Sequence, residues 1–186
     1  MADPIVFNIA AYKSVTLTEG IGKRFAIWFQ GCLINCPGCC NPEMQPFVAK
    51  KLITLQTLLE LVKQAQNEHQ IEGVTFLGGE PTHQINLSLL AKGIQELGLG
   101  VILFSGRLKK QIDPTLLSHV DLLVDGMYIA KLRDSERNMI GSTNQIIHVL
   151  TPRYVDQLAW FKNHRYQRVE IAFDPNRIHL SGDVVI

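Results

Sequence analysis

Short runs of apolar, β-branched and aromatic residues recur along the chain and predict buried strands. Each run is four to six residues long and is followed closely by glycine, proline or another turn-forming residue. The predicted strands are Phe25–Gln30, Val74–Leu77, Val101–Phe104, Val120–Val124 and Ile146–Leu150.

The segments between these strands carry apolar residues at helical spacing. Thr54 is positioned to cap one helix and Asn86 to cap a second, which Gly98 ends. Asp113 and Pro114 open a short helical turn, because proline suits the first helical position. The apolar faces of the two longer helices are Leu55, Leu58, Leu59 and Val62, and Leu87, Leu90, Ala91 and Ile94.

This alternation of strands and helices predicts right-handed βαβ units around a mostly parallel sheet. A closed barrel of eight such units takes about 250 residues, so we expect an α/β fold with an open or partial barrel. We expect one domain over residues 1–186 with its core at about 25–150. Thr151–Pro152 then begins a helix that runs to about Lys162, and Val169–Phe173 and Ile178–Leu180 form a small C-terminal hairpin around a turn at 174–177.

Composition and charge limit the classes of function that the chain can have. Hydrophobic residues make up 46% and charged residues 19% of the 186 residues, as in a globular domain. The net charge of +1 gives no basic surface for nucleic acid or an anionic membrane. No apolar run approaches the roughly 20 residues of a membrane span, and Asp3 and Pro4 do not fit a secretory signal. We therefore expect a cytoplasmic protein with neither a nucleic-acid nor a membrane partner.

All four cysteines lie within nine residues, at Cys32, Cys36, Cys39 and Cys40. A disulfide framework joins distant segments, so one tight cluster indicates metal binding or redox chemistry instead. The C-x3-C-x2-C spacing of the first three lets their thiolates hold three corners of a cubane iron–sulfur cluster. The fourth iron would then be free to bind a substrate or cofactor.

Polar and glycine residues follow the other predicted strands, and a parallel sheet brings them to the same edge as the cysteines. Gly78 and Gly79 have no side chain, so their backbone can approach a ligand closely. Glu80 offers a carboxylate that could accept from an ammonium group. Ser105 and Asp125 follow the next two strands, where Ser-Gly and Asp-Gly are also ordinary turns.

Simpler interpretations stay open for several of these residues. A structural zinc site prefers four ligands, and adjacent Cys39 and Cys40 are awkward on one ion, although His83 could complete such a site. Cys40 itself is interpreted as a packed or oxidation-prone thiol. Residues 78–81 could form a tight turn with a surface acid, and the basic run at 107–110 is interpreted as a solvated face.

The cysteine motif after the first predicted strand and Gly-Gly-Glu-Pro after the second resemble the two hallmark elements of the radical S-adenosylmethionine superfamily. The resemblance implies a partial (β/α)6 barrel and a [4Fe-4S] cluster on Cys32, Cys36 and Cys39. It also implies that S-adenosylmethionine binds the unique iron and is cleaved reductively to methionine and a 5′-deoxyadenosyl radical, which abstracts hydrogen from a substrate. The cofactor-binding residues it implies are Gly38, Cys40, Gly78, Gly79, Glu80, Pro81, Ser105 and Asp125.

Within that superfamily the chain resembles the activating proteins of glycyl-radical enzymes, and most closely the branch that activates anaerobic ribonucleotide reductase. The likeness rests on the cysteine motif through Asn41, on Asp-Leu-Leu-Val-Asp-Gly-Met-Tyr-Ile at 121–129 and on Gly-Ser-Thr-Asn-Gln at 141–145. The chain departs from the branch with Cys40 in place of an aromatic and Glu80 in place of aspartate. A third departure is Ser105-Gly106-Arg107, where the branch has Thr-Gly-aromatic.

The resemblance implies a glycyl-radical enzyme as protein partner and a flavodoxin- or ferredoxin-type electron donor. Two other functions stay open: a radical enzyme that modifies another peptide or a small molecule, and a non-catalytic iron–sulfur or zinc-binding module. The Gly-Gly-Glu-Pro loop disfavours the non-catalytic module, because an electron carrier needs no site for a cofactor amine.

Overall fold

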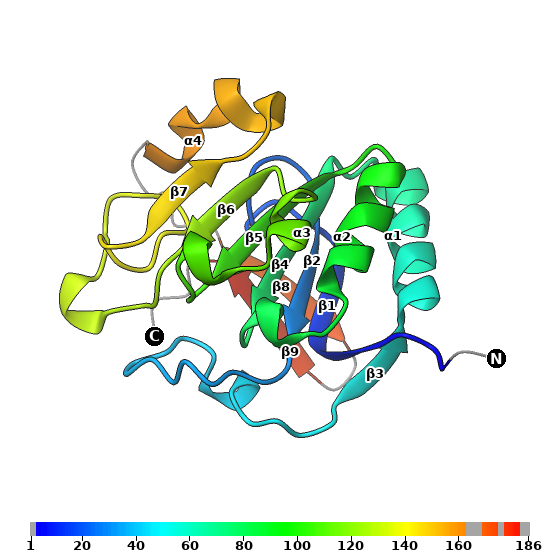
Figure 1. The fold of residues 1–186 in the computed structure, drawn as a ribbon, viewed down its shortest axis with the longest axis horizontal. Coiled ribbons are helices and arrows are strands. Elements are labelled where there is room, and N and C mark those ends of the chain that lie inside the picture. The colour runs from blue at the N-terminus through cyan, green and yellow to red at the C-terminus, as the bar shows by residue number, and fades with distance from the viewer. Residues whose placement is uncertain (1–2, 163–168, 175–176, 183–186) are drawn as a thin grey trace.

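The computed structural model describes residues 3–162, 169–174 and 177–182 and contains a seven-stranded sheet (Figure 1). Its strands are β1 (Val6–Thr16), β2 (Arg24–Phe29), β3 (Lys51–Thr54), β4 (Gly73–Gly78), β5 (Gly100–Ser105), β6 (Leu122–Asp125) and β7 (Ile146–Val149). Their order is β3-β1-β2-β4-β5-β6-β7. The central strands β2, β4, β5 and β6 run parallel, whereas β1, β3 and β7 pair antiparallel. This mostly parallel, partial barrel confirms the predicted fold class.

The sequence pattern predicts the parallel strands but not β1 and β3, which form one end of the sheet. Strand β1 mixes Asn8, Lys13 and Ser14 with apolar residues, and it is only partly buried along its length. The apolar run that identifies a fully buried strand is therefore interrupted there. Strand β7 is confirmed as a strand, but because it pairs antiparallel with β6 it ends the parallel part of the sheet.

Helices cover one face of the sheet, with α1 and α2 side by side at the right of Figure 1. Their apolar residues pack against alternate strand residues such as Phe25, Ile27 and Phe29 and form the larger core. No helix in the described part of the chain is long and apolar enough to cross a membrane. The helices are α1 (Leu55–His69), α2 (Leu87–Glu96) and α3 (Pro114–Leu117).

The two predicted helix caps behave differently. The hydroxyl oxygen of Thr54 accepts a hydrogen bond from the N–H of Thr57 at 3.2 Å, which confirms the cap of α1. Asn86 occupies the N-cap position of α2, as predicted, but its side chain makes no cap hydrogen bond and its backbone has a left-handed φ of 69°. Asparagine tolerates this conformation, and here it turns the chain into the helix.

The segment after β7 packs on the opposite face of the sheet. The sequence predicts one helix from Thr151 to about Lys162, but the structure has a 3-10 helix at Pro152–Gln157 followed by the short α4 (Ala159–Lys162). The N–H of Leu158 donates to a carbonyl three residues earlier, which is 3-10 geometry. This segment contributes two buried side chains, Tyr154 and Phe161, to the smaller core. The other buried members of that core are Ile21, Ile102, Leu122, Val124 and Ile140.

Arg24 fastens this segment to the amino ends of the parallel strands. Its guanidinium is fully buried and donates to the carbonyls of Val74 and Gly100 at 2.6 and 3.1 Å and to the hydroxyl of Thr75 at 3.1 Å. It also donates to the hydroxyl of Tyr154. A buried guanidinium is tolerated only when its donors are satisfied, so Tyr154 helps to hold a charge inside the protein.

The C-terminal hairpin of β8 (Val169–Asp174) and β9 (Arg177–Gly182) confirms the predicted hairpin, although part of its turn, 175–176, lies outside the described residues. It lies behind the sheet in Figure 1. Glu170 accepts from Lys13 Nζ at 2.6 Å and from the N–H of Leu17 at 2.7 Å. The N–H of Gly182 donates to Glu19 at 3.0 Å, so the open end of the hairpin is tied to the region of β1 through both of its strands.

Replacing Tyr154 with phenylalanine removes one acceptor from the buried guanidinium. We expect Tyr154→Phe to lower the free energy of unfolding by about 1–3 kcal/mol, measured by urea titration of circular dichroism. The matched control is Tyr12→Phe, because the Tyr12 ring is part-exposed and stacks on Phe25. Equal losses in the two variants would show that the Arg24–Tyr154 hydrogen bond does not anchor the segment.

Candidate functional site

The cysteines lie on a loop that leaves the carboxyl end of β2 and is closed at its base. The N–H of Gly31 donates to the carbonyl of Met44 at 2.8 Å, and the N–H of Cys32 donates to that of Gln45 at 2.9 Å. We call residues 31–46 the cysteine loop. In Figure 1 it runs along the lower edge, below the ends of the parallel strands. The predicted position of the cysteines at the carboxyl edge of the sheet is therefore what the structure shows.

The thiols of the cysteine loop influence one another. Cys32, Cys36 and Cys39 are half-buried and Cys40 is exposed. Burial raises the pKa of the Cys36 thiol, and the charges of Cys39 and Cys32 raise it further. A hydrogen bond from Cys40 lowers the pKa of Cys39 to about 6, and the same bond raises the pKa of Cys40. Cys39 is thus held near neutral pH as a thiolate, the form that binds metals.

The glycine loop, residues 78–81, follows β4 and packs directly on the cysteine loop. The N–H of Gly79 donates to the carbonyl of Phe29 at 2.8 Å, and the N–H of Glu80 to that of Gly31 at 2.9 Å. A Cβ on Gly79 would lie 2.5 Å from the same Gly31 oxygen. The sequence suggests that this glycine leaves space for a ligand, but the structure fills that space with the cysteine loop. Gly79 lets the two loops meet backbone to backbone.

The other members of the glycine loop shape its path. Gly78 has a φ of 103°, and a Cβ there would lie 2.4 Å from the nitrogen of Phe29. Pro81 is buried and begins a 3-10 helix, Pro81–His83. Both residues therefore set the path of the backbone. Gly78 adopts a positive φ that only glycine adopts easily, and the ring of Pro81 fixes its own φ.

The Glu80 carboxylate is buried and joins the glycine loop to the end of β5. Oε1 accepts from the hydroxyl of Ser105 at 2.8 Å and from the hydroxyl and N–H of Thr82 at 2.7 and 3.1 Å. Oε2 accepts from the N–H of Gly106 at 2.8 Å. Because a carboxylate has about four lone-pair sites, Oε2 retains room for one further donor. Ser105 thus contacts Glu80, and the Glu80 carboxylate joins the glycine loop to the loop after β5.

Asp125 lies at the end of β6, opposite Ser105 in the strand register. Its Oδ2 accepts from the N–H of Lys109 at 2.6 Å and so holds the loop after β5. Its Oδ1 lies 3.1 Å from Nε2 of His148 on β7, and both atoms are buried. Both oxygens of the Asp125 carboxylate therefore contact groups of the protein itself, the N–H of Lys109 and the ring of His148. The sequence leaves His148 without a role.

Residues 126–145, the loop after β6, contact the cysteine loop from another side. The backbone N–H of Tyr128 hydrogen-bonds the Cys36 sulfur. The Tyr128 ring lies 3.7 Å from the position that a Cβ on Gly38 would take. Gly38 has a φ of 75°, so its backbone conformation also favours glycine. This loop therefore covers the middle of the cysteine motif.

The Gly-Ser-Thr-Asn-Gln segment explains how that loop is held closed. Gln145 accepts from the N–H of Gly141 and donates to the carbonyl of Gly126, each at 2.9 Å. Asn144 donates to the carbonyl of Met127 at 3.0 Å. The hydroxyl of Ser142 accepts from the N–H of Ile129 at 3.2 Å, so the motif that the sequence supported only by resemblance fixes the backbone on either side of Tyr128.

Several side chains that build the site carry no local signal in the sequence. Gln30 is buried and donates from Nε2 to the carbonyl of Pro46 at 2.7 Å, which braces the cysteine loop from inside. Arg137 donates to the carbonyl of Gln145 at 3.1 Å and pairs with Asp134. Only their partners in the folded loops reveal these roles.

The donor set fits an iron–sulfur cluster. Three half-buried thiols share one loop, and backbone N–H groups point at their sulfurs, including Asn41 to Cys39 at 3.4 Å. Such hydrogen bonds to sulfur tune cluster potentials. In the described residues, no three His, Cys, Asp or Glu side chains converge on a point where they could hold a single metal ion. His83, the suggested fourth zinc ligand, instead packs its ring 5.6 Å from that of Phe47.

A methyl group on Gly79 tests the contact between the two loops. We expect Gly79→Ala to lower the free energy of unfolding by about 1–3 kcal/mol, because backbone atoms must move to admit it. Urea titration of the metal-free protein measures the change. The control, Gly93→Ala in α2, meets only the flexible Leu59 side chain and gains helix propensity. Unchanged stability of Gly79→Ala would contradict the backbone packing described above.

The relatives of this chain include proteins described as activating proteins or activating enzymes. The anaerobic ribonucleoside-triphosphate reductase-activating protein of Escherichia coli K12 is 29% identical over 159 residues, which cover 77% of this chain and 99% of that protein. The protein of the same description from Vibrio cholerae is 26% identical over 153 residues, with the same shares covered. A putative glycyl-radical enzyme activating enzyme of Haemophilus influenzae is 38% identical over 159 residues, 81% of this chain and 57% of that protein.

The fold and the family model agree with these relatives. The crystal structure of QueE from Escherichia coli superposes with a TM-score of 0.50 at 14% identity, covering 68% of this chain and 73% of that one, and so shares the fold. Residues 18–148 match the family described as 4Fe-4S single cluster domain. The cofactors of such a protein are a [4Fe-4S] cluster and S-adenosylmethionine, as predicted. The chain therefore belongs to the 4Fe-4S single cluster domain family and is a radical S-adenosylmethionine protein.

Proposed function

We propose that the chain activates a glycyl-radical enzyme by installing the radical on that partner. The observation that carries the proposal is the backbone contact between the cysteine loop and the glycine loop at the carboxyl edge of the sheet. Similarity over nearly the full length of reductase-activating proteins supports the partner class. We further propose that the chain works in the cytoplasm with a flavodoxin- or ferredoxin-type electron donor.

In this proposal Cys32, Cys36 and Cys39 hold the cluster and leave one iron without a protein ligand. When bound there and reduced, the cluster would supply the electron for reductive cleavage of S-adenosylmethionine to methionine and a 5′-deoxyadenosyl radical. Cys40 hydrogen-bonds Cys39 and is not a ligand. The residues proposed to surround the cofactor are Gly38, Cys40, Gly78, Gly79, Glu80, Pro81, Ser105 and Asp125.

The geometry supports two kinds of role among these residues. Glu80 keeps one lone-pair site on Oε2, which can accept from the cofactor ammonium group. Ser105 orients that carboxylate through its hydroxyl, and Asp125 positions the loop after β5. Gly78 and Gly79 bring the cofactor-binding backbone against the cysteine loop. The described strands form an open sheet from β3 to β7, and we propose that a polypeptide substrate enters at the open side of this partial barrel.

A stepwise experiment tests the proposal with anaerobic ribonucleotide reductase as partner. The protein is reconstituted anaerobically with iron and sulfide, reduced, and given S-adenosylmethionine. Formation of 5′-deoxyadenosine supports a radical enzyme, and a glycyl electron-spin signal on the added reductase supports this partner. Cleavage with no glycyl signal on any glycyl-radical enzyme of the organism would favour another peptide or a small molecule. No cleavage by fully loaded, reduced protein would indicate a non-catalytic module.

The adjacent thiols Cys39 and Cys40 give a matched pair of variants. We expect Cys39→Ala to lose the cluster, because no other thiol has the required spacing, and Cys40→Ala to keep it. Iron and acid-labile sulfide per chain after anaerobic reconstitution measure both outcomes. Loss of iron from Cys40→Ala, with Cys39→Ala still loaded, would exchange the two assignments.

A further inference from the structure

The loops that leave the parallel strands at their carboxyl ends expose large apolar side chains. Each of these loops exposes at least one, and Leu33 and Ile85 are 74% and 83% exposed. At the amino ends, the loops that enter β4 and β6 bury Ile71 and Val120, at 4% and 0%, although Leu17 before β2 is 48% exposed. Exposed apolar residues gathered at one end mark an interaction site more often than scattered ones do. We name the exposed set the apolar rim: Leu33, Ile85, Leu108 and Met127.

Basic side chains lie on the same loops. Lys109 and Lys110 follow β5, and Lys131 and Arg133 follow β6; all four are exposed. None of the four has a carboxylate within ion-pair distance among the described residues. We call these four residues the basic rim. The sequence alone reads the run at 107–110 as a solvated face, but the fold places it beside the site.

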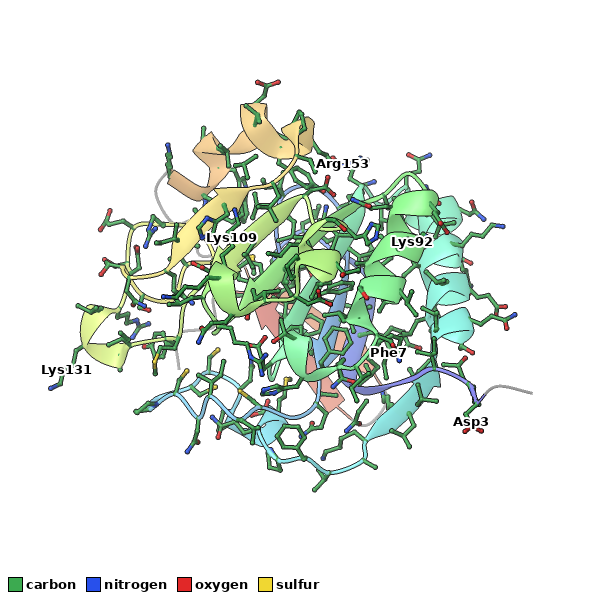
Figure 2. All side chains as sticks on the ribbon, viewed as in Figure 1. Asp3, Phe7, Lys92, Lys109, Lys131 and Arg153 are labelled. Atoms are coloured by element: carbon green, nitrogen blue, oxygen red, sulfur yellow. The ribbon has the colours of Figure 1, made fainter. Side chains whose placement is uncertain are left out.

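Packing contacts put both parts of the basic rim next to the cysteine loop. Gly106, just before the first pair, lies so close to Ile34 of the cysteine loop that a Cβ on it would be 2.5 Å away. Ala130, just before the second pair, lies 3.6 Å from the Cβ position of Gly38. Figure 2 shows Lys109 and Lys131 on one side of the molecule, away from Asp3 and Lys92. The cations therefore flank the cysteine loop.

The charge on these two loops is positive even after their acids are included. The loop after β5, residues 106–113, has the exposed carboxylate Asp113, and the loop after β6 has the exposed Glu136. Asp134 is buried and pairs with Arg137. A chain with a net charge of only +1 thus concentrates positive charge around the site. Such a patch attracts and orients an acidic partner.

We propose that the apolar and basic rims together dock an acidic polypeptide segment of the partner, with apolar side chains next to the radical-accepting residue. This inference rests on the proposed function and deepens it, because it states the chemistry of the partner surface. The apolar rim favours protein over nucleic acid, since a nucleic-acid backbone offers no apolar side chains to cover it. Apolar contacts at the centre supply affinity, and the surrounding charges supply association rate and orientation.

The test measures association of the cluster-loaded protein with full-length anaerobic ribonucleotide reductase at low and high salt. We expect Lys109→Glu/Lys110→Glu and Lys131→Glu/Arg133→Glu each to slow association about tenfold at low salt, and Ile85→Ser to weaken the complex about tenfold. The matched control, Lys63→Glu/Lys92→Glu, makes the same charge change on α1 and α2 and should leave association unchanged. Every variant should still form 5′-deoxyadenosine without the reductase, which separates docking from chemistry.

The outcomes separate the inference from the proposed function. If wild type binds the reductase and all rim variants bind as well, the docking surface is wrong and the proposed function stands. If wild type cleaves S-adenosylmethionine but neither binds nor activates the reductase, the proposed partner and the proposed docking surface are both wrong. Rim-dependent binding of a 30-nucleotide single strand, or rim-dependent self-association in sedimentation, would assign the surface to nucleic acid or to a second copy and overturn the inference.

Discussion

The N–H of Glu80 reaches the carbonyl of Gly31 in the cysteine loop because Gly79 has no side chain to hold the two loops apart. The bond from the N–H of Gly79 to the carbonyl of Phe29 continues the parallel pairing of β2 with β4, so the sheet register fixes where the two loops meet. The thiols and the buried Glu80 carboxylate are then held at one edge with little freedom. Preorganisation of that kind is what a site for a reactive radical requires, because loose positioning permits side reactions.

The cysteine loop is braced from three directions, and each brace brings a different chemistry. The glycine loop supplies backbone donors and Glu80. The loop after β5 is drawn in by Ser105 and Gly106, which share the Glu80 carboxylate. The loop after β6 supplies the Tyr128 N–H to Cys36. Because these braces come from separate strands, the site depends on the whole parallel sheet. At the opposite edge of the sheet, Arg24 holds the C-terminal segment against the strands.

Local patterns predict the parts of the molecule that depend on local physics. The spacing of Cys32, Cys36 and Cys39 and the buried runs of β2, β4, β5 and β6 are visible in the sequence. Strand β1 is not, because its polar residues break the run and its position depends on pairing with β2. The part played by Gln145 could not be read locally either, since its partners become neighbours only in the folded loop. Asn86 lies at the predicted cap position of α2, but the sequence does not show that its backbone is left-handed and that its side chain makes no cap hydrogen bond.

The most direct measurement is iron and sulfide analysis of anaerobically reconstituted protein, combined with electron-spin resonance of the reduced cluster before and after addition of S-adenosylmethionine. Three thiolate ligands predict about four irons and four sulfides per chain, with one iron open. The spectrum of the reduced cluster should therefore change when the cofactor binds that iron. Stoichiometric zinc without iron or sulfide, or a full cluster whose spectrum ignores saturating cofactor, would contradict a cubane with an open corner at the carboxyl edge of this sheet.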